Sequence, residues 1–299
     1  MTQGPHRRTD LGALILAVVA VSLSGPMMTA TDAPALGIAF WRNAIAAVVM
    51  APLLMRQHAT LQQLDRRQWI TMAGAGVLLG LHFAAWIPSL RYTSIAASTA
   101  LVATQVVWAA VLAFLAGHRA PRLEWIGIGI ALLGVVVLTG IDVSLTPRAL
   151  IGDSLALAGA MASAAYMHLG QRVRSTLPLS VYTGVVYTIS AITLFTVCSV
   201  GSVPLSGYTS GAWLLIAGVT VVAQFGGHSL LNLALRSFTA TAVSIAILLE
   251  MPGSTLVGWI WPGQRPPFAL LPAAMLIVAG VLLVIRAGRP QPPDADALS

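Results

Sequence analysis

Four polar side chains stand near the middle of long apolar segments, where they could bind or carry a charged solute. Glu250 lies about eleven residues inside one segment, and His82, Gln105 and Gln224 reach a similar depth in three others. Eleven helical residues rise roughly 16 Å, about half of a bilayer core. A charge there costs about 2.5–3.5 kcal/mol, so Glu250 should be neutral, paired or facing a wet cavity. It is therefore either a proton-coupling or amine-binding site, or a packing acid bonded to backbone freed by Pro252.

Helical spacing groups these residues with others on shared faces. Side chains three or four residues apart are neighbours on a helix surface. A polar stripe on an apolar helix should face protein or water, which favours a cavity over simple interhelical hydrogen bonding. The tryptophans could stack on an aromatic substrate or a cation, or only pack. The sets that share a face are His82 with Trp86, Gln105 with Trp108, and Gln224 with His228 and Asn232.

Arg42 is the other charge inside an apolar segment, about ten ångströms below its outer end. It could bind a substrate carboxylate, extend outward to the interface, or have a structural or gating role. Asp10 and Asp153 are interpreted as helix N-caps where two segments begin. The histidines form no spaced cluster with cysteine or carboxylate that would bind a metal. No nucleotide-binding loop or nucleophile–base motif is present, so we expect neither enzymatic activity nor a cofactor.

Composition places these residues in a membrane protein. The 299 residues are 57% hydrophobic and 8% charged, against about 25% charged residues in soluble domains. A span needs roughly 20 mostly apolar residues, which predicts an all-α integral membrane fold with ten transmembrane helices. The expected spans are 11–30, 35–55, 69–90, 94–116, 124–141, 152–171, 180–200, 211–235, 239–261 and 268–286.

The arginines predict how the chain is oriented. With the N-terminus inside, twelve arginines fall on the cytoplasmic side and three, Arg91, Arg148 and Arg265, on the far side. This positive-inside bias predicts a multi-pass protein of the inner (plasma) membrane with both termini cytoplasmic and an uncleaved first span. All 16 basic residues are arginines scattered between apolar runs. The lipid bilayer is therefore the expected partner, and nucleic acid is not.

The two halves of the chain are similar at an offset of about 145 residues. Leu90-Arg91 corresponds to Leu235-Arg236, and Asp10 corresponds to Asp153. Each half holds five spans, an odd number, so the two halves must cross the membrane in opposite directions. The chain thus divides into two inverted-topology five-helix repeats, residues 1–146 and 147–289, with a disordered tail over 290–299. Inverted repeats place a site near the midplane and favour alternating access.

Several motifs in this order resemble the drug/metabolite transporter superfamily, and within it the ten-span EamA-type exporters. The resemblance covers nearly the whole chain and implies a substrate cavity between the halves, with spans five and ten peripheral. The family often has a proline after the Gln or Glu of spans four and nine, where this chain has Val106 and Met251. Pro252 remains in span nine, but span four has no proline there, so span four is expected to be straighter than in the family's other members. The motifs are Phe40-Trp41-Arg42-Asn43, His82-Phe83, Arg91-Tyr92-Thr93, Ala103-Thr104-Gln105, Gly152-Asp153, Gly227-His228 and Leu249-Glu250.

The sequence therefore predicts a secondary transporter that exports small metabolites. Amino acids, aromatic or bulky ones in particular, are the favoured substrates, with a proton on Glu250 as a possible counter-ion. Multidrug or lipophilic-cation export is the alternative, and a channel or a membrane-embedded lipid enzyme belongs to another class. The sequence leaves open the substrate's identity, the transport direction and whether the protein is a monomer or a homodimer. The expected substrate-binding residues are Arg42, His82, Trp86, Gln105, Trp108, Gln224, His228, Asn232 and Glu250.

Overall fold

The fold is a bundle of helices. The computed structural model describes residues 6–89, 91–93, 95–140, 146–261 and 267–287. Within these ranges all regular elements are helical, and ten segments are long and apolar enough to cross a membrane. The ten predicted spans are thus confirmed to within a few residues. The largest difference is at span six, which begins at Pro147 because Thr146 caps the helix by accepting from the Ala149 amide at 3.2 Å. The tail predicted over 290–299 lies outside the described residues.

Six spans are continuous helices and four are interrupted. The continuous spans are α3 (Ala35–Arg56), α5 (Arg66–Ser89), α8 (Arg122–Thr139), α9 (Pro147–Arg174), α10 (Leu179–Val200) and α15 (Leu270–Ala287). The interrupted spans are α1 (His6–Ser22) with α2 (Ser24–Thr29), α6 (Ile95–Ala103) with α7 (Gln105–Leu115), α11 (Ser210–Val219) with the π-helix η1 (Thr220–Ser229) and α12 (Leu230–Ala234), and α13 (Ala240–Ile247) with α14 (Glu250–Ile260). A short helix, α4 (His58–Gln63), connects α3 to α5.

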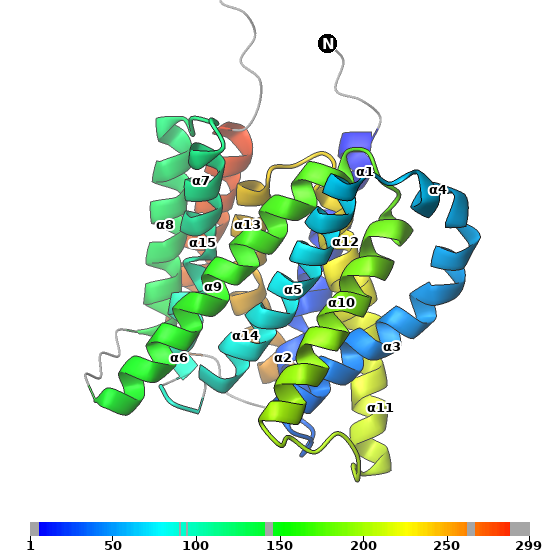
Figure 1. The fold of residues 1–299 in the computed structure, drawn as a ribbon. Helices are drawn as coiled ribbons and strands as arrows, with labels where there is room; N and C mark the ends of the chain where they lie inside the picture. Colours follow the sequence, from blue (N-terminus) through cyan, green and yellow to red (C-terminus); the bar gives the residue numbers. More distant parts are fainter. Residues whose placement is uncertain (1–5, 90, 94, 141–145, 262–266, 288–299) are drawn as a thin grey trace, which may run out of the picture.

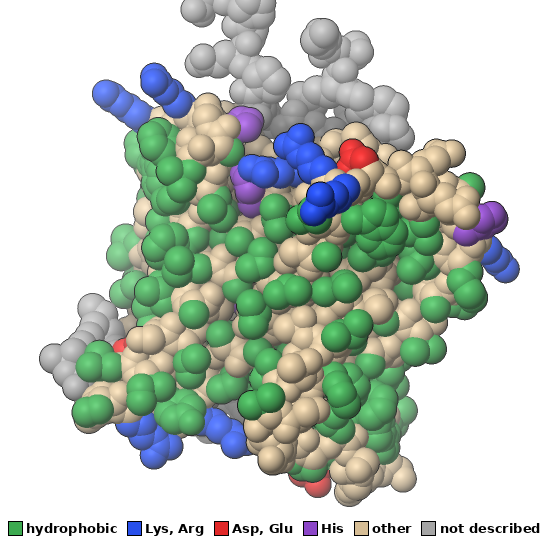
Figure 2. Space-filling model, viewed as in Figure 1, with side chains coloured by type: hydrophobic (Ala, Val, Ile, Leu, Met, Phe, Trp, Pro, Cys, Tyr) green, Lys and Arg blue, Asp and Glu red, His purple; other side chains and the backbone are tan. Residues whose placement is uncertain are grey.

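The two halves interlock instead of lying side by side. In Figure 1, α1 begins and α15 ends at the same end of the bundle, as an even number of spans requires. Helix α5 packs against α9 and α10, α3 packs against α10, and α1 packs against η1 and α12. Each of these contacts joins an element of the first half to one of the second. On the face seen in Figure 2, apolar side chains cover the middle and charged ones gather at the two ends, as a membrane protein requires.

Helices α8 and α15 approach each other closely. A Cβ added at Gly127 would lie 2.8 Å from the Gly280 carbonyl oxygen, and one added at Gly134 would lie 2.8 Å from the Ala273 oxygen. Only glycine permits backbones this close, which is how helices commonly associate in lipid. The pair stands at one side of the bundle in Figure 1. Its glycines serve helix packing, although Leu138 and Thr139 at the end of α8 reach the central cavity.

Span four is interrupted although it has no proline after Gln105. The break falls at Thr104, whose hydroxyl donates to the Leu101 carbonyl at 2.6 Å while its amide bonds to the same oxygen at 3.1 Å. This side-chain back-bond and tighter turn bend the helix without a proline. Span nine breaks at Leu248 and Leu249, because Pro252 has no amide hydrogen for the Leu248 carbonyl, which accepts from the Met251 amide at 3.2 Å instead. Thr104 and Leu249 are 145 residues apart, so both halves break at the equivalent place.

Candidate functional site: a cavity between the halves

A cavity of about 620 Å³ lies between the two halves. It extends from Met167 and Leu231 toward the end of the bundle where α8 and α14 finish, marked by Thr139 and Pro267. A volume of this size suits a small organic molecule. Both halves contribute polar lining. The first half provides Ser24, Arg42, His82, Thr99, Gln105 and Thr139, and the second provides Ser163, His228, Glu250, Ser254 and Thr255.

Arg42 is held rigidly at the cavity wall. Only 3% of the residue is exposed. Its Nε donates to Gln224 Oε1 at 2.8 Å, and the Gln224 amide donates to Asn43 Oδ1 at 3.2 Å. The guanidinium carbon lies 4.9 Å from the centre of the Phe83 ring, within cation–π range. The Nη2 group is buried and has no hydrogen-bond partner in the protein. A fixed guanidinium with a free donor is suited to bind an anionic group of a solute.

Glu250 is the opposite charge on the same cavity. It opens α14, just after the break in span nine, and the Ser24 hydroxyl donates to its Oε1 at 3.5 Å. Arg42 and Glu250 are close enough to interact electrostatically, but no ion pair joins them. Arg42, which is buried, and Glu250, which is half-buried, thus line one cavity with opposite charges and without direct contact. Arg42 comes from the first half and Glu250 from the second, so a solute that touched both would bridge the halves.

Aromatic rings form the wall next to Arg42. The His82 and Trp86 rings are stacked at 5.7 Å between centroids and 16° between planes, as their four-residue spacing predicts. His82 is fixed by a 2.9 Å contact between Nδ1 and the Gly159 carbonyl, which sets that nitrogen as the donor. Phe83 meets His228 edge to face at 5.6 Å. Trp86 Nε1 and His228 Nδ1 are buried without partners, so the site offers further polar atoms for a ligand.

Three of the expected site residues do not line the cavity. Gln224 is fully buried and binds Arg42 from behind, so it positions that side chain. Asn232 accepts from the Tyr166 hydroxyl at 2.7 Å, nearer the α1 end of the bundle. Trp108 is half-buried outside the lining. The other six, Arg42, His82, Trp86, Gln105, His228 and Glu250, line one cavity.

Span eight, which carries Gln224, His228 and Asn232, contains a π-helix. The four-residue spacing assumed an α-helix, but Thr220–Ser229 form i→i+5 bonds. The Gln224 carbonyl accepts from the Ser229 hydroxyl at 3.1 Å and from the Tyr187 hydroxyl at 3.3 Å. These side chains satisfy backbone that the wider turn leaves under-bonded.

Sequence reasoning missed several small polar residues in the lining. Ser24, beside Gly25 and Pro26, follows the break in span one at Leu23 and donates to Glu250. Ser163 and Thr255 contribute hydroxyls from α9 and α14. The Ser24-Gly25-Pro26 run is a helix-breaking signal that could have indicated a cavity-facing break. Isolated serines and threonines carry no such signal, because they are common in membrane helices that only pack.

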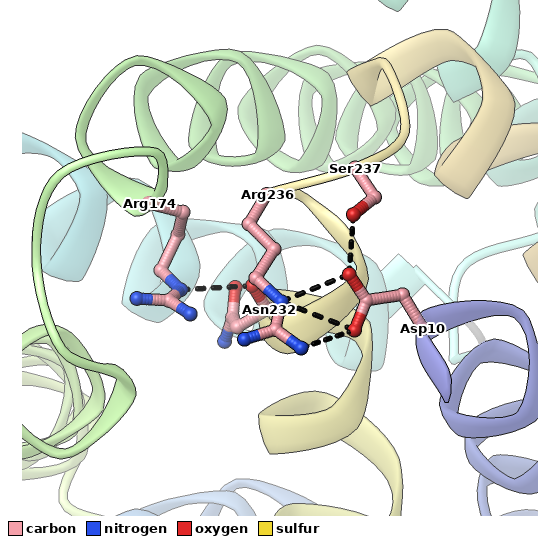
Figure 3. Close-up of polar contacts among 5 residues, drawn as sticks. All are labelled: Asp10, Arg174, Asn232, Arg236 and Ser237. Atoms are coloured by element: carbon pink, nitrogen blue, oxygen red, sulfur yellow. Dashed lines mark hydrogen bonds and ion pairs between the residues drawn. The ribbon is translucent and has the colours of Figure 1, made fainter. Parts of the chain in front are cut away.

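Asp10 and Asp153 lie inside helices, so their interpretation as N-caps is wrong. Asp10 is fully buried in α1 and accepts from Arg236 Nη2 at 2.6 Å and from Arg236 Nε at 2.8 Å, while the Ser237 hydroxyl also donates to it (Figure 3). The pair with Asp10 raises the pKa of the Arg236 guanidinium above its usual value. Asp153 lies in α9, and its Oδ1 is buried without a partner. The same end of the bundle as Asp10 carries a second, polar cleft lined by Asp65, Arg67, His118, Arg119, Glu124, His168 and Arg172.

No group of three or more His, Cys, Asp or Glu side chains within the described ranges is arranged to bind a metal ion. The cavity's donors are instead a guanidinium, a carboxylate, imidazoles and hydroxyls. Such a set binds a polar organic solute through hydrogen bonds and charge. Two inverted five-helix halves with a polar site at mid-membrane depth define the architecture of secondary transporters.

Comparison with known proteins identifies the family. The model of the EamA-like transporter family matches residues 10–140 and 150–286, one match in each half. The chain belongs to the EamA-like transporter family and is a membrane transporter of small molecules. A crystal structure described only as that of a protein is similar over 95% of this chain and 100% of its own, with a TM-score of 0.77 and 19% identity. That likeness concerns the fold alone. A search of curated proteins found no match.

Proposed function

We propose that this transporter exports small metabolites, amino acids in particular, by alternating access. The observation that supports the proposal is the unpaired placement of Arg42 and Glu250 on one cavity. A free amino acid carries a carboxylate and an ammonium group on one carbon, so it could satisfy both charges at once. Because each charge comes from a different half, the bound solute would connect the two parts that must rock against each other.

The aromatic wall favours side chains with apolar or aromatic character. Phe83, Trp86 and His228 offer ring faces and edges beside the Arg42 guanidinium. Stacking and edge-to-face contacts of this kind are each worth about 0.5–1.5 kcal/mol beyond burial of area. Bulky or aromatic amino acids would therefore bind better than glycine or serine.

Export of lipophilic cations is the alternative with some support, because Glu250 and Trp86 could hold a cation. Arg42 counts against it. A second positive charge beside its buried guanidinium would be repelled. The amino-acid proposal uses both charges of the cavity, whereas the cation proposal uses one and is opposed by the other.

Proton coupling through Glu250 is part of the proposal. A carboxyl in the wall of a mid-membrane cavity can bind a proton from one side and release it to the other as access alternates. The membrane is proposed to be the inner (plasma) membrane, with the start of α1 and the end of α15 on the cytoplasmic side. The positive-inside distribution of arginines supports that orientation.

Proteoliposomes provide the test. Flux of a bulky amino acid should saturate and be competed by related amino acids. Its decarboxylated amine and its deaminated acid should compete poorly. Flux that rises linearly with concentration would reject a carrier in favour of a channel. Equal competition by the amine and the amino acid would favour cation export.

Glu250→Gln tests the coupling. The variant should lose flux driven by a pH gradient but keep exchange of labelled for unlabelled solute, which moves no net proton. Glu124→Gln is the matched control, because Glu124 lies on the separate polar cleft. Unchanged gradient dependence in Glu250→Gln would remove Glu250 from the coupling role.

A further inference from the structure

The ion pair between Asp10 and Arg236 closes one end of the bundle. Asp10 belongs to α1 of the first half, and Arg236 follows α12 of the second half. Figure 3 shows Arg236 reaching Asp10 from the α12 side, with Ser237 on the same carboxylate. The cavity extends the other way. Its lining in span one starts at Val21, eleven residues or roughly 16 Å of helix beyond Asp10. The Asp10–Arg236 ion pair thus joins the two halves at this end of the bundle, which the cavity does not reach.

The internal repeat contains a second pair of the same kind. Arg236 corresponds to Arg91, and Asp10 corresponds to Asp153. Arg91 follows α5 as Arg236 follows α12, and Asp153 lies early in α9 as Asp10 lies early in α1. Because the halves are inverted, the second pair belongs at the opposite end of the bundle, toward which the cavity extends. Its partners again come from different halves.

This second pair is not formed in the structure. No ion pair joins Arg91 to Asp153, although both residues are described. Asp153 Oδ1 is buried without a hydrogen-bond partner, and Arg91 is exposed. The two segments are nevertheless in contact. A Cβ added at Gly152 would lie 2.6 Å from the Thr93 amide nitrogen, so the start of α9 rests on the turn that carries Arg91. The backbone next to Asp153 is therefore in direct contact with the turn that carries Arg91.

We propose that Arg91 and Asp153 form an ion pair in the opposite conformation of the carrier, where the Asp10–Arg236 pair is broken. In inverted repeats the two halves exchange conformations as access alternates. The contact that closes one end in one state therefore closes the other end, through equivalent residues, in the other state. The two pairs form in turn, and each biases the equilibrium toward its own state. The inference rests on the alternating access proposed above, but it does not depend on the substrate.

The cavity's accessibility can be measured with one cysteine. The chain's own cysteine, Cys198, is buried and is replaced by alanine; Thr255→Cys then places a thiol in the lining toward the far end. A membrane-impermeant maleimide is added to right-side-out membrane vesicles. The labelling rate reports the fraction of molecules whose cavity is open to that side. This readout needs no substrate, so it separates failure of this inference from failure of the amino-acid proposal.

The two pairs predict opposite effects. Asp10→Asn removes the pair seen here and should slow labelling, because the loss of a charge-assisted hydrogen bond shifts the ratio of open to closed molecules about tenfold or more toward the closed ones. Arg91→Gln and Asp153→Asn should not slow labelling, but should reduce transport because they destabilise the state that completes the cycle. Their thermal stability should stay that of the parent, because no contact of this structure is lost.

A double-mutant cycle tests whether Arg91 and Asp153 interact during transport. Arg91→Gln with Asp153→Asn should reduce transport no more than either single change, because one interaction is removed in all three. Additive losses, or full transport in either single variant, would overturn the proposal. A lower melting temperature in Asp153→Asn would also overturn it, because it would give Asp153 a structural role in the state described here. Arg56→Gln is the control for an exposed arginine away from this turn, because Arg148 itself donates to the Arg91 carbonyl at 2.9 Å.

Discussion

Replacing Arg42 by glutamine tests how the cavity recognises its solute. Arg42 is 3% exposed, and its Nη2 is the buried donor without a protein partner. If it binds a carboxylate, the variant loses a hydrogen bond to a charged group, worth about 1.5–3 kcal/mol. At about 1.4 kcal/mol per tenfold, the affinity for an amino acid should fall by roughly 10- to 100-fold. The affinity for the decarboxylated amine should not fall, since that ligand never used the guanidinium.

Equilibrium binding to purified protein provides the measurement, with the amino acid and the amine titrated in parallel. Arg56→Gln is the control, because Arg56 ends the same helix on its exposed side. Equal losses for the two ligands would show general damage to the cavity. An unchanged amino-acid affinity would refute carboxylate binding by Arg42 and leave the residue with a structural or gating role.

Three further changes test the partner of Arg42, the packing of α8 against α15, and the cap of α9. Gln224→Leu leaves Nε of Arg42 without its partner and should weaken amino-acid binding about tenfold while sparing the amine; loss of both would contradict a positioning role. Gly280→Ala pushes a Cβ to 2.7 Å from Ala131 Cβ in α8 and should lower stability by about 1–3 kcal/mol in detergent unfolding. Gly129→Ala, which meets open space, should not. Thr146→Ala removes the helix cap and should lower the free energy of unfolding by about 1 kcal/mol. An unchanged melting temperature would show that the cap does not stabilise the protein.

Sequence reasoning identified the charged residues of the site but not their relationships. It placed Arg42 and Glu250 in apolar segments and gave both a possible role toward a solute. It did not indicate that they face one cavity unpaired, because hydropathy gives the depth of a residue and not the rotation of its helix. It grouped Gln224 with His228, but only His228 lines the cavity, while Gln224 is fully buried against Arg42. It also gave Asp10 a local capping role, while the structure pairs it across the chain with Arg236.

The break in span four shows a similar limit. The absence of proline after Gln105 predicted that span four would be straighter than in the family's other members. The hydroxyl of Thr104 supplied another route to the same bend. Threonine is frequent in helices that do not bend, so the sequence could not distinguish this threonine from others.

The number of spans, their inverted arrangement and the family followed from the sequence by itself. The physical reason is that lipid cannot satisfy backbone polar groups, so each crossing needs a long apolar helix that is visible in the composition. Five crossings in each similar half then require opposite directions. The cavity, the Arg42–Gln224 contact and the Asp10–Arg236 pair were decided only by the tertiary structure. They depend on helix rotation and on side chains 182 and 226 residues apart, which no local pattern encodes.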